Sequence, residues 1–349
     1  MNTFFKKEDF KLCYVPVPKG YPQSQTHSGV SLYKGKYYLT TSPYPSYSET
    51  RYKRYFKKIL RKLSFDILFP LTRAEAYENP CLYVQDIGNG IPTAFKLMQQ
   101  RALMDTPENY YNLPAFNSDP DIFIEEGKIH VLNRPVYRTK LCPGEALNRY
   151  EIRLYMISGE IDEERFKLER IFRIASSETR VLISPCFFKY NTEYYILELE
   201  TNAANDGCSF DGLYKISSKQ IDGLKDNNMW EKIELSSPKD ILPWHISVFK
   251  YNGILYAIIT CIKKGEKQHY WQMLGEFNKD LSCLKIFSMP LTDYNSYRGS
   301  AVVNDKGEFV LYSTTVQERI VGGKSVDGRE VIMAHAPFED VIEKIKLND

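Results

Sequence analysis

The sequence contains no run of about 18 apolar residues, so it predicts no membrane-spanning helix. It has no C-x-x-C pair, and its odd number of cysteines is scattered along the chain, at positions 13, 81, 142, 186, 208, 261 and 283. This spacing is typical of reduced, structural thiols. The N-terminus carries Lys6, Lys7, Glu8 and Asp9 where a signal peptide needs its apolar core. We therefore expect a cytoplasmic protein.

An excess of charge of either sign is also missing. The net charge is +2 for 349 residues, which gives no general attraction to nucleic acid or to acidic surfaces. We therefore expect no nucleic-acid partner, and any attraction to an anion must be local. The chain is instead rich in tyrosine, with 26 residues, and is long enough for two average domains or one large all-β domain.

One pattern recurs five times along the chain. A short β run leads into a turn, and a second run rich in Tyr, Ile, Leu and Val follows it. Most of the turns contain Gly after Asn, Lys or Glu, which is the signature of a β-hairpin. The five segments are HSGVSLYKGKYYLTT from His27, DPDIFIEEGKIHVLN from Asp119, SPCFFKYNTEYYILE from Ser184, HISVFKYNGILYAII from His245 and RGSAVVNDKGEFVLY from Arg298.

Two more strand-like runs follow several of these hairpins, as FDGLYKIS and WEKIELS do after the third. Four-stranded units repeated in this way predict an all-β fold, a five-bladed β-propeller of four-stranded antiparallel blades. We expect one such domain over residues 1–349. The last unit is one strand short, and FKLCYVPV near the N-terminus could supply that strand and close the ring. The alternative is a β-sandwich with coincidental hairpins.

In a propeller, the first strand of each blade lines the central channel and begins at its mouth. The first residues of the five hairpins should therefore converge on one funnel: His27, Asp119, Ser184, His245 and Arg298. Two histidines, an aspartate and an arginine would form a polar cluster that a purely structural channel does not need. The alternative is that these groups only satisfy one another and the strand ends.

Long loops between the second and third strands should lie on the same face of the propeller. The insertion at about 43–79 in the first blade contains RYKRYFKKILRKL, residues 51–63, which has apolar side chains at helical spacing and basic ones elsewhere. This helix could simply pack on the propeller. It could also be a lid that favours anionic ligands, a membrane-surface helix or a nucleic-acid contact. The same face carries aromatic residues that could offer flat rings to a sugar, namely Tyr44, Tyr47, Tyr137, Tyr294, Tyr297 and Trp244.

Two segments, SDPDIF at 118–123 and HSGVSLYKGKYYLTT at 27–41, together with the five repeats, resemble the five-bladed glycoside hydrolases of the arabinanase, xylosidase and invertase type. The resemblance spans about residues 27–337. It implies three carboxyl groups at the starts of first strands: a general-base Asp, an Asp that orients and tunes the acid, and a general-acid Glu. Asp119 matches the orienting Asp, whereas His27 stands at the base position and Ile183 at the acid position.

The missing base and acid of this mechanism could be replaced in two ways. Histidine is a competent acid or base near neutral pH, so His245 or His27 could take one role. Alternatively, a carboxylate from a loop at the mouth could reach in, with the candidates Glu75, Glu78, Glu145, Glu200 and Asp206. His27, His245 and Asp119 could also hold a metal ion in the channel, and Arg298 with the basic helix would suit phosphate.

The sequence therefore predicts a carbohydrate-active propeller, a glycoside hydrolase that cleaves a glycosidic bond in the central funnel. We expect Asp119, His245 and His27 to be catalytic. The expected substrate-binding residues are Arg298, Asp121, Trp244, Ser184, Tyr297 and Glu200, with Asp121 deeper in the channel. No cofactor is expected apart from the optional channel metal, and the ligand is a carbohydrate, an anionic one if the basic helix is a lid. The alternatives are a non-catalytic, lectin-like propeller and a protein-interaction scaffold.

Overall fold

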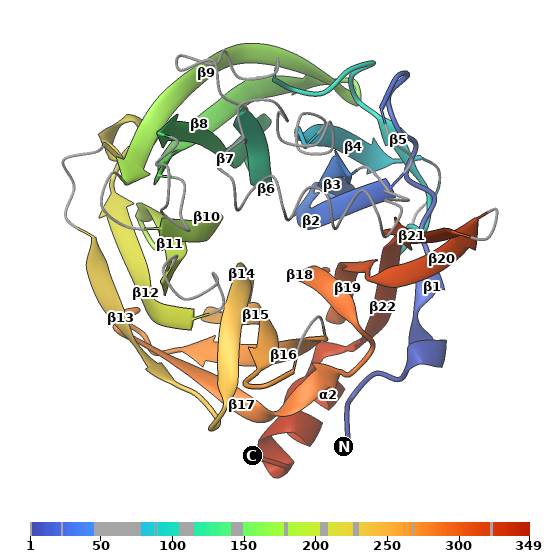
Figure 1. Cartoon of the computed structure of the whole chain (residues 1–349), viewed down its shortest axis with the longest axis vertical. Coiled ribbons are helices and arrows are strands. Elements are labelled where there is room, and N and C mark those ends of the chain that lie inside the picture. The colour runs from blue at the N-terminus through green and yellow to red at the C-terminus, as the bar shows by residue number, and fades with distance from the viewer. Residues whose placement is uncertain are drawn as a thin grey trace, which may run out of the picture.

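The structure is a computed structural model, and it describes residues 2–21, 24–44, 78–86, 88, 90–104, 115–140, 149–177, 181–202, 209–225, 230–266, 269–321 and 324–349. The fold of these residues is all-β, and four large sheets stand around a common centre (Figure 1). The predicted basic helix at 51–63 lies outside the described residues.

Two of the sheets each contain four antiparallel strands in chain order. The first consists of β2 (Ser24–Tyr33), β3 (Lys36–Tyr44), β4 (Cys81–Gln85) and β5 (Phe95–Leu97). The second consists of β6 (Ala115–Glu125), β7 (Lys128–Lys140), β8 (Arg149–Asp162) and β9 (Arg165–Ser177). In both sheets the strand that comes first in the sequence is the innermost one in Figure 1.

An eight-stranded sheet contains two further runs of four antiparallel strands. One run is β10 (Val181–Tyr190), β11 (Glu193–Asn202), β12 (Ser209–Ser218) and β13 (Glu231–Ser236). The other is β14 (Ile241–Tyr251), β15 (Ile254–Lys263), β16 (Tyr270–Phe277) and β17 (Cys283–Thr292). The two runs join at their last strands, where β13 pairs with β17 in parallel.

The last sheet combines strands from both ends of the sequence. It consists of β18 (Ser296–Val303), β19 (Glu308–Thr315), β22 (Val331–Pro337) and β1 (Lys11–Leu12), while β20 (Gln317–Val321) and β21 (Lys324–Gly328) form a separate two-stranded ribbon. β1 pairs antiparallel with β22, and Lys11 lies opposite Met333. The prediction that the segment FKLCYVPV supplies a strand to the last unit is confirmed.

All five predicted hairpins form, as β2–β3, β6–β7, β10–β11, β14–β15 and β18–β19. Three of their turns place two consecutive residues at positive φ, at Lys34–Gly35, Glu126–Gly127 and Asn252–Gly253. This backbone pattern is the two-residue turn whose twist matches that of paired strands, and glycine adopts it at no steric cost. The turn residues seen in the sequence therefore explain why the strands reverse at these points.

The hydrophobic core is divided into clusters, and several of them combine residues of neighbouring sheets. Leu39 and Tyr83 of the first sheet pack with Tyr312 of the last sheet. On its other side the first sheet contributes Val84, which packs with Ile129 of the second sheet. Tyr83 and Tyr312 are fully buried, so part of the high tyrosine content fills the space between sheets with large rings.

The helices of the described chain are short and lie at the edge of the ring in Figure 1. α2 (Phe338–Leu347) follows β22 and buries Phe338, Val341 and Ile345 in a cluster with Phe249. The others are the 3-10 helices η1 (Lys7–Asp9) and η5 (Ile221–Gly223). Within the described ranges, no helix has the length and apolar character needed to cross a membrane.

Candidate functional site

The inner strands β2, β6, β10, β14 and β18 each carry one extra residue near the same end. In β2, for example, Thr26 pairs with Ser42 and Gly29 pairs with Thr40, so three steps along β2 match two steps along β3. Such a β-bulge bends the strand and re-aims its side chains. The bulges fall at His27–Ser28, Asp119–Pro120, Ser184–Pro185, Trp244 and Arg298–Gly299.

Four of the bulge residues have a left-handed backbone. The φ angle is 55° at His27, 52° at Asp119, 55° at Ser184 and 45° at Arg298. Residues other than glycine rarely adopt this conformation, and it persists only where the surrounding structure stabilises it. Four positions far apart in the sequence therefore share one strained local geometry, and their side chains gather with His245 around the same point.

Asp119 is the centre of this gathering and is buried. Its Oδ2 accepts hydrogen bonds from Nε of Arg134 at 2.9 Å and from the backbone N–H of Ser184 at 3.4 Å, and Nη2 of Arg134 lies 2.7 Å from the same oxygen. Its Oδ1 lies 3.0 Å from Nε2 of His27 and 3.8 Å from Nδ1 of His245. Oδ1 nevertheless has no hydrogen-bond partner among the described residues. Arg134 thus fixes one oxygen of Asp119 and leaves the other facing the two histidines.

The two histidines differ in how they are held. Nδ1 of His27 lies 3.0 Å from Oε1 of Glu78 but has no hydrogen-bond partner among the described residues, and the hydroxyl of Ser118 donates to the same carboxylate oxygen at 2.7 Å. Nδ1 of His245 lies 2.9 Å from Oγ of Ser184, a contact that fixes the orientation of the ring. Nε2 of His245 is buried and has no hydrogen-bond partner in the described part of the chain.

The protonation of the site follows from burial and neighbouring charge. Burial alone would raise the pKa of Asp119, but Arg134, His27, His245 and Arg298 together hold the pKa of this carboxyl well below its usual range. Burial lowers the pKa of His245 well below its ordinary value. At neutral pH the site therefore combines an ionised carboxylate with a neutral imidazole.

The central cluster, as we name the five residues His27, Glu78, Asp119, Arg134 and His245, lines a cavity of about 170 Å³. Tyr44, Trp244 and Tyr297 add aromatic surface to the wall, and the indole N–H of Trp244 donates to the hydroxyl of Tyr297 at 3.1 Å. The guanidinium of Arg329 lies 4.3 Å from the ring centre of Tyr44 and 4.6 Å from that of Tyr297. The cavity therefore combines charged groups with flat rings.

Arg298 and Asp121 lie outside the wall of this cavity. Arg298 is fully buried, donates from Nη2 to the carbonyl of Pro185 at 3.2 Å, and reaches within 3.9 Å of one oxygen each of Asp119 and Asp121. Oδ2 of Asp121 accepts a hydrogen bond from the N–H of Phe187 at 2.7 Å, and burial raises the pKa of Asp121. Asp121 also lines a second cavity of about 260 Å³ further along the inner strands.

The remaining predicted site residues are divided between the cavity and its surroundings. Trp244 and Tyr297 line the cavity, and Ser184 contacts both Asp119 and His245. Glu200 lies on β11 opposite Leu182 and is absent from the described lining of the cavity. Ile183 is in the lining, so an apolar side chain occupies the place where the resemblance implies a general-acid Glu.

The sequence analysis did not identify Arg134. It named Glu78 as only one of five loop carboxylates that could reach the funnel. Arg134 lies directly opposite Ser118 in the β6–β7 hairpin, so counting the strand register back from the turn at Glu126–Gly127 could have placed it beside Asp119. No comparable signal exists for Glu78, which precedes β4 and is held beside β6 by a bond from the N–H of Asn117 to its carbonyl at 3.0 Å.

Three side chains of the central cluster fit a metal ion. One ligand atom from each of His27, Asp119 and His245 lies within 4.8 Å of the other two. Nε2 of His27 and Oδ1 of Asp119 approach to 3.0 Å, yet this oxygen has no hydrogen-bond partner in the described chain, as expected for two ligands that face one ion. Two histidines and one carboxylate form a ligand set of catalytic zinc. Glu78 lies at the ring nitrogen of His27 away from Asp119, whereas Ser184 contacts the ring nitrogen of His245 that is nearest to Asp119.

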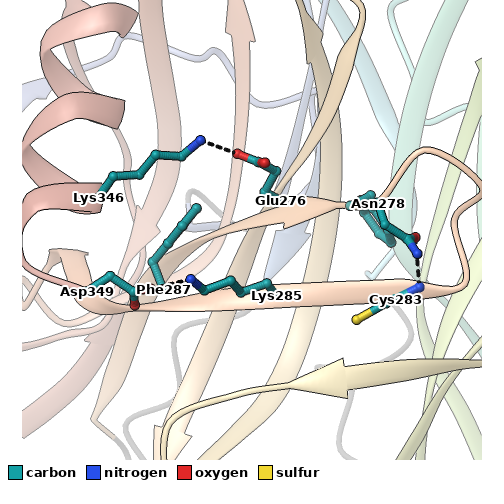
Figure 2. A pocket seen from close by; sticks show the side chains of 8 residues that line it. Glu276, Asn278, Cys283, Lys285, Phe287, Lys346 and Asp349 are labelled. Carbon is teal, nitrogen blue, oxygen red and sulfur yellow. Dashed lines mark hydrogen bonds and ion pairs between the residues drawn. The ribbon is translucent and has the colours of Figure 1, made fainter.

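A larger hollow lies elsewhere, beside α2 (Figure 2). It has a volume of about 430 Å³ and is lined by residues of β16, β17 and the C-terminal segment. Nζ of Lys346 lies 2.8 Å from Oε2 of Glu276, and Nζ of Lys285 lies 2.6 Å from Oδ2 of Asp349. We refer to these four residues as the α2 groove. Each of its carboxylates has a lysine partner, and both lysines are about half exposed.

No protein-family model and no curated protein sequence matches the chain. Solved structures do match it. An N-acetylgalactosamine deacetylase from F. plautii, in complex with blood group B trisaccharide, aligns with a TM-score of 0.59 at 13% identity, over 93% of this chain and 94% of that one. A xylan β-1,4-xylosidase from Bacillus halodurans C-125 aligns with a TM-score of 0.60 at 14% identity, over 92% of this chain and 54% of that one.

A third similar structure is a GH43 β-xylosidase/α-arabinofuranosidase from a compost microbial metagenome, in complex with xylotriose. It aligns with a TM-score of 0.58 at 12% identity, over 93% of this chain and 94% of that one. The predicted resemblance to propeller glycoside hydrolases of the xylosidase type is thus confirmed at the level of the fold. Identities this low carry no information about activity, which has to be argued from the site.

Proposed function

We propose that the chain is a single five-bladed β-propeller domain over residues 1–349. The three four-stranded sheets supply three blades, and the two runs of the eight-stranded sheet supply two more. The bulge that recurs at the same end of all five inner strands supports this equivalence. Radial repetition of this kind brings distant chain positions into one pocket at the centre.

We propose further that this propeller is a carbohydrate-active hydrolase and that the central cluster is its reacting site. The observation that carries the proposal is the convergence of His27, Asp119 and His245 within 4.8 Å of one another, beside a cavity with aromatic walls. Trp244 and Tyr297 offer the flat surfaces on which sugar rings pack. Similar folds that hold a trisaccharide or xylotriose support the ligand class.

In this proposal, each side chain of the cluster has its own role in hydrolysis. A divalent metal held by His27, Asp119 and His245 would supply a bound water that ionises near neutral pH. Arg134 holds Oδ2 of Asp119, so Oδ1 stays directed at the two rings. The carboxylate of Glu78 lies 3.0 Å from Nδ1 of His27. Without a metal, Nε2 of the neutral His245 ring, which has no hydrogen-bond partner among the described residues, would accept a proton instead.

The first candidate for the cleaved bond is the glycosidic bond, as the sequence predicts. Glu78 and Asp119 are the two carboxyl groups in the cavity wall, and the ring of His27 lies between them, 3.0 Å from each. A flanking pair of carboxyl groups is the usual arrangement for glycoside hydrolysis. Because Ile183 supplies no acid, Glu78 would have to protonate the leaving oxygen in this mechanism.

The second candidate is the bond to an acyl substituent of a sugar. Two histidines and one aspartate are the ligand set of metal-dependent hydrolases, and a similar fold is that of an N-acetylgalactosamine deacetylase. Attack on a carbonyl carbon needs an activated water and a group that stabilises the oxyanion. It therefore has less need of the general-acid Glu that Ile183 replaces.

The test begins with purified protein that has been stripped with a chelator and reloaded with Zn²⁺, Mn²⁺ or Ca²⁺. It is assayed on aryl glycosides, on xylo- and arabino-oligosaccharides, on oligosaccharides of uronic acids, and on N- and O-acetylated sugars. New reducing ends and free acetate are measured separately. We expect turnover of one substrate class that disappears on chelation, returns with one metal and is absent in Asp119→Asn.

The two products assign the bond, because reducing ends report glycosidic cleavage and acetate reports removal of an acyl group. Binding of a sugar in calorimetry without release of either product would contradict a hydrolase and would support a lectin-like role. Absence of binding to every carbohydrate in the panel would contradict the ligand class as well.

A further inference from the structure

The hydroxyl of Tyr297 is a polar group of the cavity wall that has no role in hydrolysis so far. Tyr297 lies on β18 directly before the bulge at Arg298, and Trp244 is the bulge residue of β14. Both side chains line the cavity of the central cluster, together with His27 and His245. The hydroxyl therefore belongs to the same pocket as the proposed reacting groups.

The ring of Tyr297 is held by its neighbours. Its centre lies 5.2 Å from that of His27, 4.6 Å from that of His245 and 4.9 Å from that of Tyr270. The guanidinium of Arg329 lies 4.6 Å from the same ring centre. Four neighbours at these distances leave little of the ring surface for a sugar, although Tyr297 is partly exposed. The hydroxyl is therefore the part of this side chain that is best placed to contact a substrate.

The backbone of Tyr297 is fixed as well. Its carbonyl accepts a hydrogen bond from the hydroxyl of Thr314 at 2.7 Å and another from the hydroxyl of Ser313 at 3.3 Å. Tyr297 also lies directly opposite Thr314 in the pairing of β18 with β19. A group on a rigid strand keeps the accurate position that catalysis requires.

The hydroxyl of Tyr297 uses only its accepting side. A tyrosine hydroxyl can both donate and accept a hydrogen bond, whereas an indole N–H can only donate. The N–H of Trp244 donates to the oxygen of Tyr297 at 3.1 Å, so the direction of this bond is certain. Within the described chain, the hydroxyl of Tyr297 has no acceptor for its own proton. Trp244 thus leaves the hydroxyl as a hydrogen-bond donor in the cavity wall.

We propose that Tyr297 is a catalytic residue whose hydroxyl donates a hydrogen bond to the substrate oxygen that becomes negatively charged during hydrolysis. The role rests on the proposed function and selects its second candidate, the removal of an acyl substituent from a sugar. In that reaction hydroxide attacks the carbonyl carbon, a C–O bond forms, and the π electron pair of the C=O bond moves to the carbonyl oxygen. The hydroxyl of Tyr297 stabilises this oxyanion and keeps its own proton.

The chemistry of tyrosine favours the acyl bond over the glycosidic bond. The leaving oxygen of a glycoside takes up a whole proton, and the group that supplies it works best when its pKa is near the operating pH. A tyrosine hydroxyl ordinarily has a pKa of about 10, so it gives up its proton poorly at neutral pH. A donor to an oxyanion has no such requirement, because its proton stays in place.

The experiment compares Tyr297→Phe, which keeps the ring and removes the hydroxyl, with Trp244→Phe, which keeps a flat ring and removes the indole N–H. Tyr312→Phe is the matched control, because Tyr312 is fully buried outside the described cavity wall and its hydroxyl donates to the carbonyl of Pro92 at 3.0 Å. For each variant we measure kcat and KM on acetylated sugars, the pH profile of kcat and the melting temperature.

A second measurement needs no turnover. The affinity of the Zn²⁺-loaded protein for acetate is determined by calorimetry, because a carboxylate oxygen of acetate accepts the same hydrogen bond as the oxyanion. Wild type and Tyr297→Phe are compared under the same conditions.

We expect Tyr297→Phe to lower kcat by about 100-fold, the usual loss when one oxyanion donor is removed, with KM within about 3-fold of wild type. The pH profile of kcat should keep its shape, and acetate should bind about 10-fold more weakly. Trp244→Phe should lower kcat by about 10-fold, because the hydroxyl loses the partner that orients it. Tyr312→Phe should lower the melting temperature and keep kcat within about 3-fold.

Other results would overturn the proposal. Wild-type kcat in Tyr297→Phe, or a rise in KM alone, would show that the hydroxyl does not act in the reaction. Loss of one limb of the pH profile in this variant would make the hydroxyl a proton donor. Release of reducing ends without acetate by the wild type would overturn the choice of bond, while a hydrolase at the central cluster would stand.

The proposed function can also fail by itself, if the wild type hydrolyses nothing. The acetate affinities then decide the role of the hydroxyl as a donor. About 10-fold weaker binding to Tyr297→Phe would still support that role. Equal affinity in the two proteins, or no binding to the wild type, would overturn it.

Discussion

The central cluster and the α2 groove contain the same kinds of charged side chain in opposite circumstances. The groove is the larger hollow, about 430 Å³ against about 170 Å³. Its lysines, Lys285 and Lys346, are about half exposed and pair with Asp349 and Glu276 across water-accessible space (Figure 2). In the cluster, the side chain of Arg134 is 13% exposed and that of Asp119 only 2%.

The difference shows that the larger hollow is not the one with the more deeply buried charges. Ion pairs that water can reach are screened and contribute little. Buried charges lower the stability of a fold unless they are paired. The region of the central cluster also contains four strained backbone positions, and Oδ1 of Asp119 has no hydrogen-bond partner among the described residues. The predictions below test whether these destabilising features mark the functional site.

The largest effect should come from Asp119→Asn. The amide keeps the shape of the side chain but removes the charge that His27 and His245 face, so we expect turnover to fall by about 1,000-fold or more. Circular dichroism and the melting temperature should show a folded protein. Full activity in this variant would remove the central cluster from consideration as the reacting site.

A smaller loss should follow from Arg134→Lys. Nε and Nη2 of Arg134 both contact Oδ2 of Asp119, and a single ammonium group cannot reproduce this fork. We expect kcat to fall by about 100-fold while the net charge of the site is unchanged. If the lysine variant is as active as wild type, charge alone holds Asp119, and the described geometry is unimportant.

The next effect is that of Glu78→Gln, which removes the negative charge that lies 3.0 Å from Nδ1 of His27. We expect a drop in kcat of about tenfold. The chain offers a control in Glu308→Gln, because Glu308 and His335 form a similar pair at 3.2 Å on the surface. Steady-state kinetics of the two variants should differ, and equal kinetics would contradict a role for Glu78 in orienting His27.

The smallest effect should come from the α2 groove. Lys346→Ala breaks the contact with Glu276, and an exposed pair of this kind contributes less than about 1 kcal/mol to the free energy of unfolding. Chemical denaturation should register this small change, and activity should stay at the wild-type level. A large loss of activity in Lys346→Ala would indicate that the α2 groove, and not the central cluster, is the functional region.

Much of this architecture was predictable because it repeats. The hairpin pattern predicted five strand pairs, and radial geometry predicted that His27, Asp119 and His245 would meet although they lie far apart in the sequence. A strand of two residues, Lys11–Leu12, was predictable because the last unit lacked one. A repeated structural unit can be recognised from the sequence alone, because several copies show the same pattern of strands and turns.

The rest depends on how far individual side chains reach, which no local pattern encodes. Arg134 becomes important because it extends from the second strand across to the bulge of the first. Arg298 occupies the expected strand position, but its guanidinium donates to the carbonyl of Pro185, and the residue is not part of the described cavity wall. Glu78 reaches the site from the residues before β4, and the course of such segments is set by tertiary contacts.

The pairing of β1 with β22 has a consequence for how the molecule is made. Lys11 emerges from the ribosome long before its partner Met333. Until then the nascent protein is an open arc whose unpaired strand edges are exposed to other chains. The pairing of β1 with β22 joins residues far apart in the sequence, so its loop-closure cost is high, and β1 of one copy could instead pair with β22 of another.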